Sequence, residues 1–75
     1  VNVNKSGQIK AMMPGKVLEI LIKIGDEVSD GTPLLVIESM KMENTINSSL
    51  SGKVSNILVK VDDSVQYDQV MIEIE

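Results

Sequence analysis

The sequence predicts an all-β domain, a flattened eight-stranded β-barrel or sandwich made of two pseudo-symmetric four-stranded halves. Three observations lead to this prediction. Valine and isoleucine greatly outnumber leucine and alanine, and side chains branched at Cβ favour strands. Apolar and polar residues alternate with a period of two, and no convincing helical period is present. The chain also contains an internal repeat.

The repeat relates residues 15–38 to residues 52–75 by a shift of 37 positions. Identical pairs begin with Gly15/Gly52 and continue to the last position of each segment. Internal identity of this kind indicates a duplicated structural unit. We therefore expect two halves related by a pseudo-twofold axis. Their central link should then lie at the opposite end of the barrel from both termini.

The same elements are expected in the same order in each half. In the first half they are a short strand over 7–12, an alternating strand around 19–24, a turn at Gly25-Asp26 and a strand over 33–38. In the second half they are a short strand over 42–46, an alternating strand around 56–61, a turn at Asp62-Asp63 and a strand over 70–75. Alternation places one set of side chains on the core face, namely Ile20, Ile22, Ile24, Ile57, Val59 and Val61.

The composition excludes several classes of chemistry. The chain has no cysteine and no histidine, so it lacks thiolates, imidazole bases and the commonest metal ligands. Tyr67 is the single aromatic residue, and the net charge of −4 repels phosphate backbones, so nucleic-acid binding is not expected. No apolar run is long enough to insert across a membrane. We expect no catalytic residue and no metal site, and any chemistry should reside in an attached group.

One segment departs from the repeated pattern, the link Glu38–Glu43 between two expected strands. A tight hairpin here would carry Met40 and Lys41 at its two central positions. Such loops prefer Asn-Gly or Asp-Gly, which tolerate positive φ. A lone lysine in a turn is ordinarily a solvated charge, and paired methionines ordinarily pack in a core, but a methionine at a hairpin tip cannot do so. Departures from local residue preferences are most often found at functional sites, so we expect a functional site in this link.

The sequence Ser39-Met40-Lys41-Met42 resembles the Ala-Met-Lys-Met signature of biotinyl carrier domains, the biotin carboxyl carrier modules of biotin-dependent carboxylases and decarboxylases. Residues 11–15 are similar to the family motif Ala-Pro-Met-Pro-Gly, and residues 23–28 to its Lys-x-Gly-Asp-x-Val turn. The resemblance covers nearly the whole chain and implies the pseudo-symmetric barrel inferred from the repeat. We expect residues 1–8 to form a linker or N-terminal edge and residues 9–75 the carrier domain, at the carboxyl end of a longer protein.

The resemblance implies that a biotin protein ligase joins biotin to Lys41 through an amide. Biotin on Lys41 would then shuttle a carboxyl group between a biotin carboxylase and a carboxyltransferase or decarboxylase, with no catalytic residue in the domain itself. The hairpin residues expected to take part in ligase recognition are Ser39, Met40, Met42, Glu38 and Glu43. The two glutamates can equally be solvated acids at strand ends. The isolated domain should be monomeric, and both the cytoplasm and the mitochondrial matrix are compatible with it.

Several positions depart from the family pattern. Ser39 stands where alanine is usual, Met12 replaces a proline, and Asp62 replaces the glycine of the second turn. No insertion separates Gly15 from Gly25, where the bacterial multisubunit acetyl-CoA carboxylase carrier usually has a protruding thumb. The resemblance therefore favours an acyl-CoA or pyruvate carboxylase type, or a decarboxylase, over the thumb-bearing carrier.

Three other interpretations remain open. A lipoyl carrier domain of a 2-oxo acid dehydrogenase complex shares the fold, although Asp and Ala usually flank its lysine, where this chain has methionines. An unmodified barrel-sandwich structural module usually carries a long helical hairpin between its halves, and the link here is only a few residues. A free-standing catalyst is the least favoured, since the chain lacks histidine and cysteine and its few carboxylates form no recognisable catalytic group.

Overall fold

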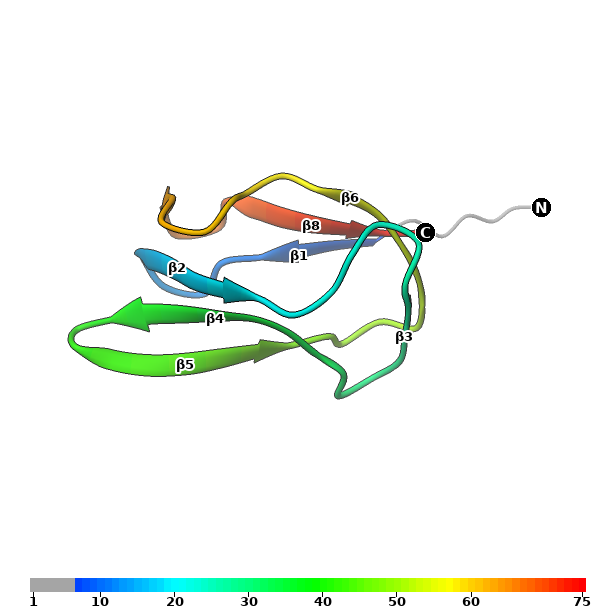
Figure 1. The fold of residues 1–75 in the computed structure, drawn as a ribbon, viewed down its shortest axis with the longest axis horizontal. Coiled ribbons are helices and arrows are strands. Elements are labelled where there is room, and N and C mark those ends of the chain that lie inside the picture. The colour runs from blue at the N-terminus through cyan, green and yellow to red at the C-terminus, as the bar shows by residue number, and fades with distance from the viewer. Residues whose placement is uncertain (1–6) are drawn as a thin grey trace.

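A computed structural model describes residues 7–75, which form eight antiparallel β-strands in two sheets packed face to face (Figure 1). The strands of the first sheet, in spatial order, are β1 (Gly7–Lys10), β8 (Val70–Ile74), β6 (Gly52–Ile57) and β3 (Glu27–Val28). Those of the second are β5 (Met42–Asn47), β4 (Pro33–Ser39), β2 (Gly15–Ile20) and β7 (Ser64–Val65). The predicted all-β fold is confirmed. Within residues 7–75 no helix is long and apolar enough to cross a membrane.

The two halves interlock, because each sheet takes two strands from each half of the repeat. Their backbone hydrogen bonds follow the shift of 37 positions. The amide of Val17 donates to the carbonyl of Asp63, and the amide of Val54 donates to the carbonyl of Asp26, both at 2.8 Å. The register also shifts at matching places, after Val17 in β2 and after Val54 in β6. The backbone hydrogen bonds and the register shifts therefore both follow the predicted pseudo-twofold relation.

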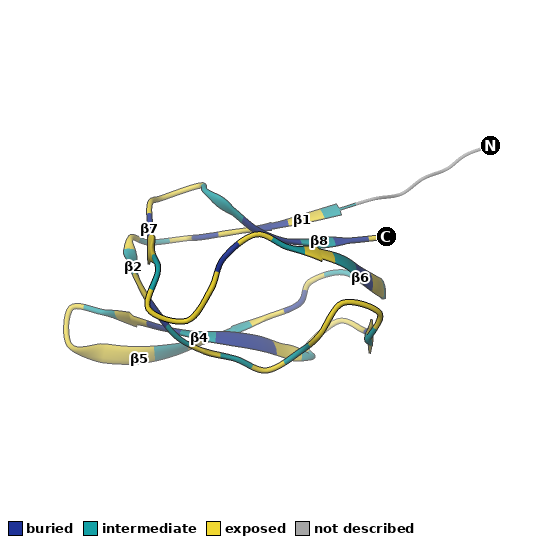
Figure 2. Ribbon diagram, turned by 45° about the horizontal axis from the view of Figure 1, so that its top comes forward, coloured by how far each residue is buried: buried dark blue, intermediate teal, exposed yellow. Residues whose placement is uncertain are grey.

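The core lies between the two sheets, and Figure 2 shows buried residues along β4 and β8 and at single positions of other strands. Fully burying a large aliphatic side chain contributes about 1.5–3 kcal/mol, so this cluster is the main source of stability. Its members are Ile9, Ala11, Val17, Val28, Leu34, Leu35, Ile37, Val54, Val59, Val65, Met71, Ile72 and Ile74.

The prediction of which residues of the two alternating strands face the core is only partly correct. Val59 is buried, and Ile20, Ile22 and Ile57 pack at the margin of the core. Ile24 and Val61 are instead 63% and 51% exposed, so the prediction that they face the core is wrong. Both residues lie in the turns that follow β2 and β6, where the backbone is no longer extended and alternation no longer sets which side chains face the core. The two strands end at residues 20 and 57, before the alternating pattern ends.

Both predicted turns are present and have the same construction. The Asp26 carboxylate accepts a hydrogen bond from the amide of Lys23, and the Asp63 carboxylate accepts one from the amide of Lys60, each at 2.9 Å. Each turn leads into a two-residue strand, β3 or β7, that the sequence did not predict. The boundary between a linker at residues 1–8 and a domain at 9–75 stays a prediction, since residues 1–6 lie outside the described part of the chain. Gly7 already pairs with β8.

Candidate functional site

The predicted hairpin joins β4 to β5 by the shortest possible connection. Strand β4 ends at Ser39 and β5 begins at Met42, and these two residues pair across the strands. Met40 and Lys41 alone therefore make the turn. The hairpin forms one end of the barrel, while Gly7 and the C-terminal residue Glu75 lie at the other (Figure 1). Lys41 therefore lies at the opposite end of the barrel from Glu75.

Both residues of the turn adopt the left-handed backbone region, with φ values of 55° for Met40 and 64° for Lys41. Two-residue hairpins use this conformation because its twist matches that of the flanking strands. An L-residue other than glycine loses roughly 1–2 kcal/mol in this region. The unfavourable turn chemistry predicted from the sequence is therefore real. The other non-glycine residues with positive φ among residues 7–75 are Asp62 and Asp68, and aspartate tolerates this region better than methionine or lysine does.

The side chains at the tip lie in solvent. Met40 is 92% exposed and Met42 is 65% exposed, and Lys41 is also exposed. Within residues 7–75 the one salt bridge joins Lys16 to Asp62, with 3.7 Å between Nζ and Oδ1. The Lys41 amine is therefore not held in an ion pair with any described residue. It is a primary amine on a four-carbon stem that another protein can reach.

Charged residues surround the base of the hairpin. Glu38 and Glu43 are exposed and lie directly opposite each other on β4 and β5. On its other side, Glu38 is paired with Lys16 of β2. Like charges placed opposite each other destabilise a strand pair slightly, although solvent screens this effect at exposed positions. The two carboxylates give the surface next to Lys41 a negative charge.

The connection between β1 and β2 packs against the base of the hairpin. The Ser39 hydroxyl donates a hydrogen bond to the backbone carbonyl of Pro14 at 2.8 Å. A Cβ atom added to Gly15 would lie 2.5 Å from the carbonyl oxygen of Glu38 and 2.6 Å from Cγ2 of Ile37. Only glycine allows this approach. The sequence did not single out Pro14 and Gly15 as hairpin supports, although both belong to the motif at residues 11–15.

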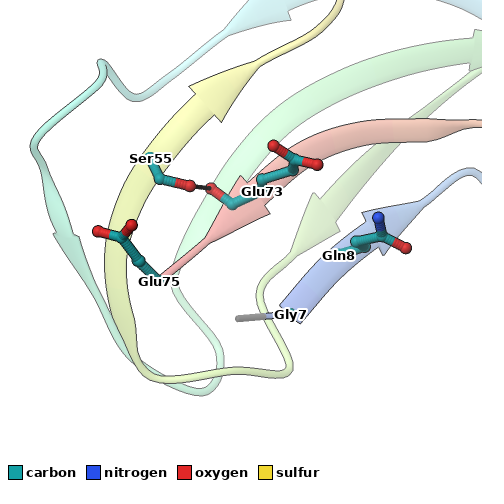
Figure 3. Close-up of a pocket in the computed structure, with 5 residues that line it drawn as sticks. All are labelled: Gly7, Gln8, Ser55, Glu73 and Glu75. Atoms are coloured by element: carbon teal, nitrogen blue, oxygen red, sulfur yellow. Dashed lines mark hydrogen bonds between the residues drawn. The ribbon is translucent and has the colours of Figure 1, made fainter. Parts of the chain in front are cut away.

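A hollow in the first sheet lies at the other end of the barrel and is unrelated to Lys41. Gly7, Gln8, Ser55, Glu73 and Glu75 line it (Figure 3). Its polar groups are partly satisfied internally, since the Ser55 hydroxyl donates to the carbonyl of Glu73 at 3.1 Å. No group of histidine, cysteine or acidic residues in the described part of the chain could hold a metal ion. The hairpin is therefore the candidate site.

Comparison with known proteins identifies the class of domain. The model of the family described as "Biotin-requiring enzyme" matches residues 7–74. The chain belongs to this family. Mouse mitochondrial pyruvate carboxylase is 42% identical over 69 residues, which is 92% of this biotinyl domain and 6% of the mouse protein. The biotin carboxyl carrier protein of Streptococcus mutans is 53% identical over 36 residues, which is 48% of this chain and 28% of that protein.

Solved structures agree with the fold. The biotinyl domain aligns over its full length with 7% of the urea carboxylase of Kluyveromyces lactis, with a TM-score of 0.89 and 27% identity. A single-chain, multi-domain long-chain acyl-CoA carboxylase aligns over 97% of this chain and 8% of its own, with a TM-score of 0.85. Its 22% identity supports the fold alone. The domain thus spans a small fraction of these relatives.

Proposed function

We propose that this biotinyl domain is a carboxyl carrier, with biotin joined through an amide to Nζ of Lys41. The observation that carries the proposal is the hairpin tip. Lys41 is exposed, is not held in an ion pair with any described residue, and occupies a two-residue turn at one end of the barrel. Met40 and Met42 flank it and are more than half exposed, so they are available for contact with another protein.

The residues at the tip fit such an attachment. An amide bond removes the positive charge of the lysine, and no described carboxylate depends on that charge for an ion pair. The stem is flexible, whereas the sheets below it are closely packed and rigid. Biotin, when attached, supplies a ureido nitrogen that takes up and releases a carboxyl group. The chain itself supplies position and reach, and none of its residues has to act as acid or base.

Met40, Met42 and Ser39 are proposed to identify Lys41 to a biotin protein ligase, with Glu38 and Glu43 at the rim of the contact. Exposed methionine is suited to this role because its flexible, polarizable side chain adapts to a partner surface. The paired carboxylates are complementary to a positively charged surface. Either glutamate alone can also be an ordinary solvated residue.

The parent enzyme is proposed to be a carboxylase of the acyl-CoA or keto-acid type. Residues 21–26 connect β2 to β3 without an insertion, so no thumb is present there. The relatives include the alpha subunit of Dictyostelium discoideum methylcrotonoyl-CoA carboxylase, 45% identical over 42 residues, 56% of this chain and 6% of that protein. A biotin carboxylase and a carboxyltransferase would be the partners. The compartment would be the bacterial cytoplasm or, in a eukaryote, the mitochondrial matrix.

The test of carrier function uses the biotinylated domain as the substrate of a separate biotin carboxylase subunit. The domain is incubated with ATP and radiolabelled bicarbonate, and label bound to the protein is counted. We expect label on the biotinylated domain and none on the Lys41→Ala variant. A domain that carries biotin on Lys41 but never acquires label, while free biotin does so in the same assay, would contradict the carrier function.

A further inference from the structure

The hairpin tip needs support from outside itself. Met40 and Lys41 both have positive φ, which is unfavourable for each, and their exposed side chains contribute little packing. The opposed carboxylates of Glu38 and Glu43 at the base add a small repulsion. Without a further contact, the turn between these two strands would be conformationally mobile.

Ser39 provides that contact. It is the last residue of β4, immediately before the turn, and its side chain is half-buried. Its hydroxyl donates to the carbonyl of Pro14 at 2.8 Å, across 25 positions of sequence. Among the described residues, this is the one side-chain hydrogen bond that joins the hairpin to a different connection of the barrel. The other bond at the tip, from the Asn44 amide to the carbonyl of Met42, stays within the hairpin.

The backbone next to this bond is closely packed. Gly15 approaches the carbonyl of Glu38 too closely for any other residue, and Gly52 has the same close contact with the carbonyl of Glu75. The glycine packing therefore belongs to the framework that the two halves share. It places Gly15 against β4, and so brings the carbonyl of the preceding residue, Pro14, within reach of the Ser39 hydroxyl.

We propose that Ser39 is a positioning residue, whose hydrogen bond to the Pro14 carbonyl holds the Met40-Lys41 turn in one orientation for the ligase that modifies Lys41. The inference rests on the proposed attachment at Lys41. Ser39 does not touch the reacting amine. Its hydroxyl restricts the tip, so the ligase meets a preorganised lysine and less ordering is needed on binding.

The test is the Ser39→Ala variant, which keeps Cβ and the strand but removes the donor. A net hydrogen bond is equivalent to about a fivefold change in an opening equilibrium. We expect backbone amide exchange across residues 39–43, followed by NMR, to rise about fivefold. We also expect the kcat/KM of ligation to fall by about threefold to fivefold. The lower kcat/KM should result mainly from a higher KM, and labelling should still reach completion.

Two further variants make the result specific. Ser39→Thr retains the hydroxyl and should restore both exchange and KM. Ser55→Ala removes a bond of the same kind, from a serine hydroxyl to the Glu73 carbonyl, in the first sheet (Figure 3). It should leave exchange at the hairpin and ligation unchanged. A change in Ser55→Ala equal to that in Ser39→Ala would mean that general loss of stability, not a local contact, controls the tip.

The outcomes separate this inference from the proposed function. Unchanged exchange at residues 39–43 in Ser39→Ala would overturn the positioning role, however well the variant is labelled. Raised exchange with unchanged KM would also overturn it, because a freer tip would then be an equally good substrate. Failure of a biotin ligase to label the wild-type domain would contradict attachment at Lys41, and the exchange data would still decide whether Ser39 orders the turn.

Discussion

Gly25 and Asp62 occupy the same position in the two halves of the repeat, and both have positive φ, of 97° and 78°. Each donates its amide across the barrel to the equivalent acceptor, the carbonyl of Val54 for Gly25 and that of Val17 for Asp62, at 2.8 Å. The duplicated framework thus demands a left-handed residue at both places. Aspartate tolerates this region better than most residues, so the second half could exchange glycine for aspartate without losing the turn.

The Gly25→Ala variant should lower the free energy of unfolding by about 1–2 kcal/mol. A Cβ atom at Gly25 meets nothing within 4 Å, so the loss would come from backbone conformation alone. Urea denaturation measures it. Asp62→Gly is the matched control, because it relieves the same unfavourable φ in the other half. If Asp62→Gly lost as much stability as Gly25→Ala, the equivalence of the two positions would be incorrect.

Gly15→Ala should lower the free energy of unfolding by about 1–3 kcal/mol through overpacking. Gly52→Ala should lower it by more, because Gly52 also has a φ of 154°, which is unfavourable for a residue with a Cβ atom. The added methyl group would collide with a backbone carbonyl, that of Glu38 or of Glu75. Thermal unfolding of both variants measures these two losses. Gly15→Ala should in addition slow ligation of Lys41, because only Gly15 supports the hairpin. Equal ligation rates for the two variants would refute that distinction.

Leu35→Ala should lower the free energy of unfolding by about 2–5 kcal/mol, because a fully buried side chain is truncated. Ile24→Ala should change it by less than about 0.5 kcal/mol, because Ile24 is largely exposed in a turn. Chemical denaturation of the pair compares a core position with one that alternation alone would place in the core. A large loss from Ile24→Ala would restore the original sequence prediction.

Met40→Asn should stabilise the domain by about 0.5–1 kcal/mol, because asparagine is favoured at the first position of this turn type. The same change should reduce the rate of ligation, since it removes an exposed methionine next to Lys41. Denaturation and ligation kinetics on one sample measure both effects. If Met40→Asn were ligated as fast as the wild type, Met40 would have no part in recognition.

Local patterns were sufficient to predict the fold class, the duplication and the place of the hairpin. The strands predicted over 33–38 and 70–75 match β4 and β8, and the unsuitable turn residues Met40 and Lys41 indicated the candidate site. The exposure of Ile24 and Val61 could not be predicted this way, since the alternation in the sequence continues past the ends of β2 and β6 into the turns that follow. Strands β3 and β7 contain two residues each, too few to show alternation.

The contact that supports the hairpin could not be predicted from the sequence either. The bond between Ser39 and Pro14 joins residues 25 positions apart, and nothing in either residue type specifies the other as its partner. The sequence predicts Ser39 as a hairpin residue of the ligase contact and as a departure from the usual alanine, but not as a donor to Pro14. The contact depends on how closely β2 approaches β4, which Gly15 sets through packing that appears only in three dimensions.

The central claim, attachment of biotin to Lys41, is tested most directly by the intact mass of the domain after incubation with biotin, ATP and a biotin protein ligase. Lys41→Ala is treated in parallel, and its melting temperature is measured to verify that it is folded. We expect the mass of one amide-linked biotin on the wild type, none on Lys41→Ala, and nearly equal melting temperatures. Biotin on Lys41→Ala, or a wild type that stays unmodified yet accepts lipoate from a lipoate ligase, would contradict the claim.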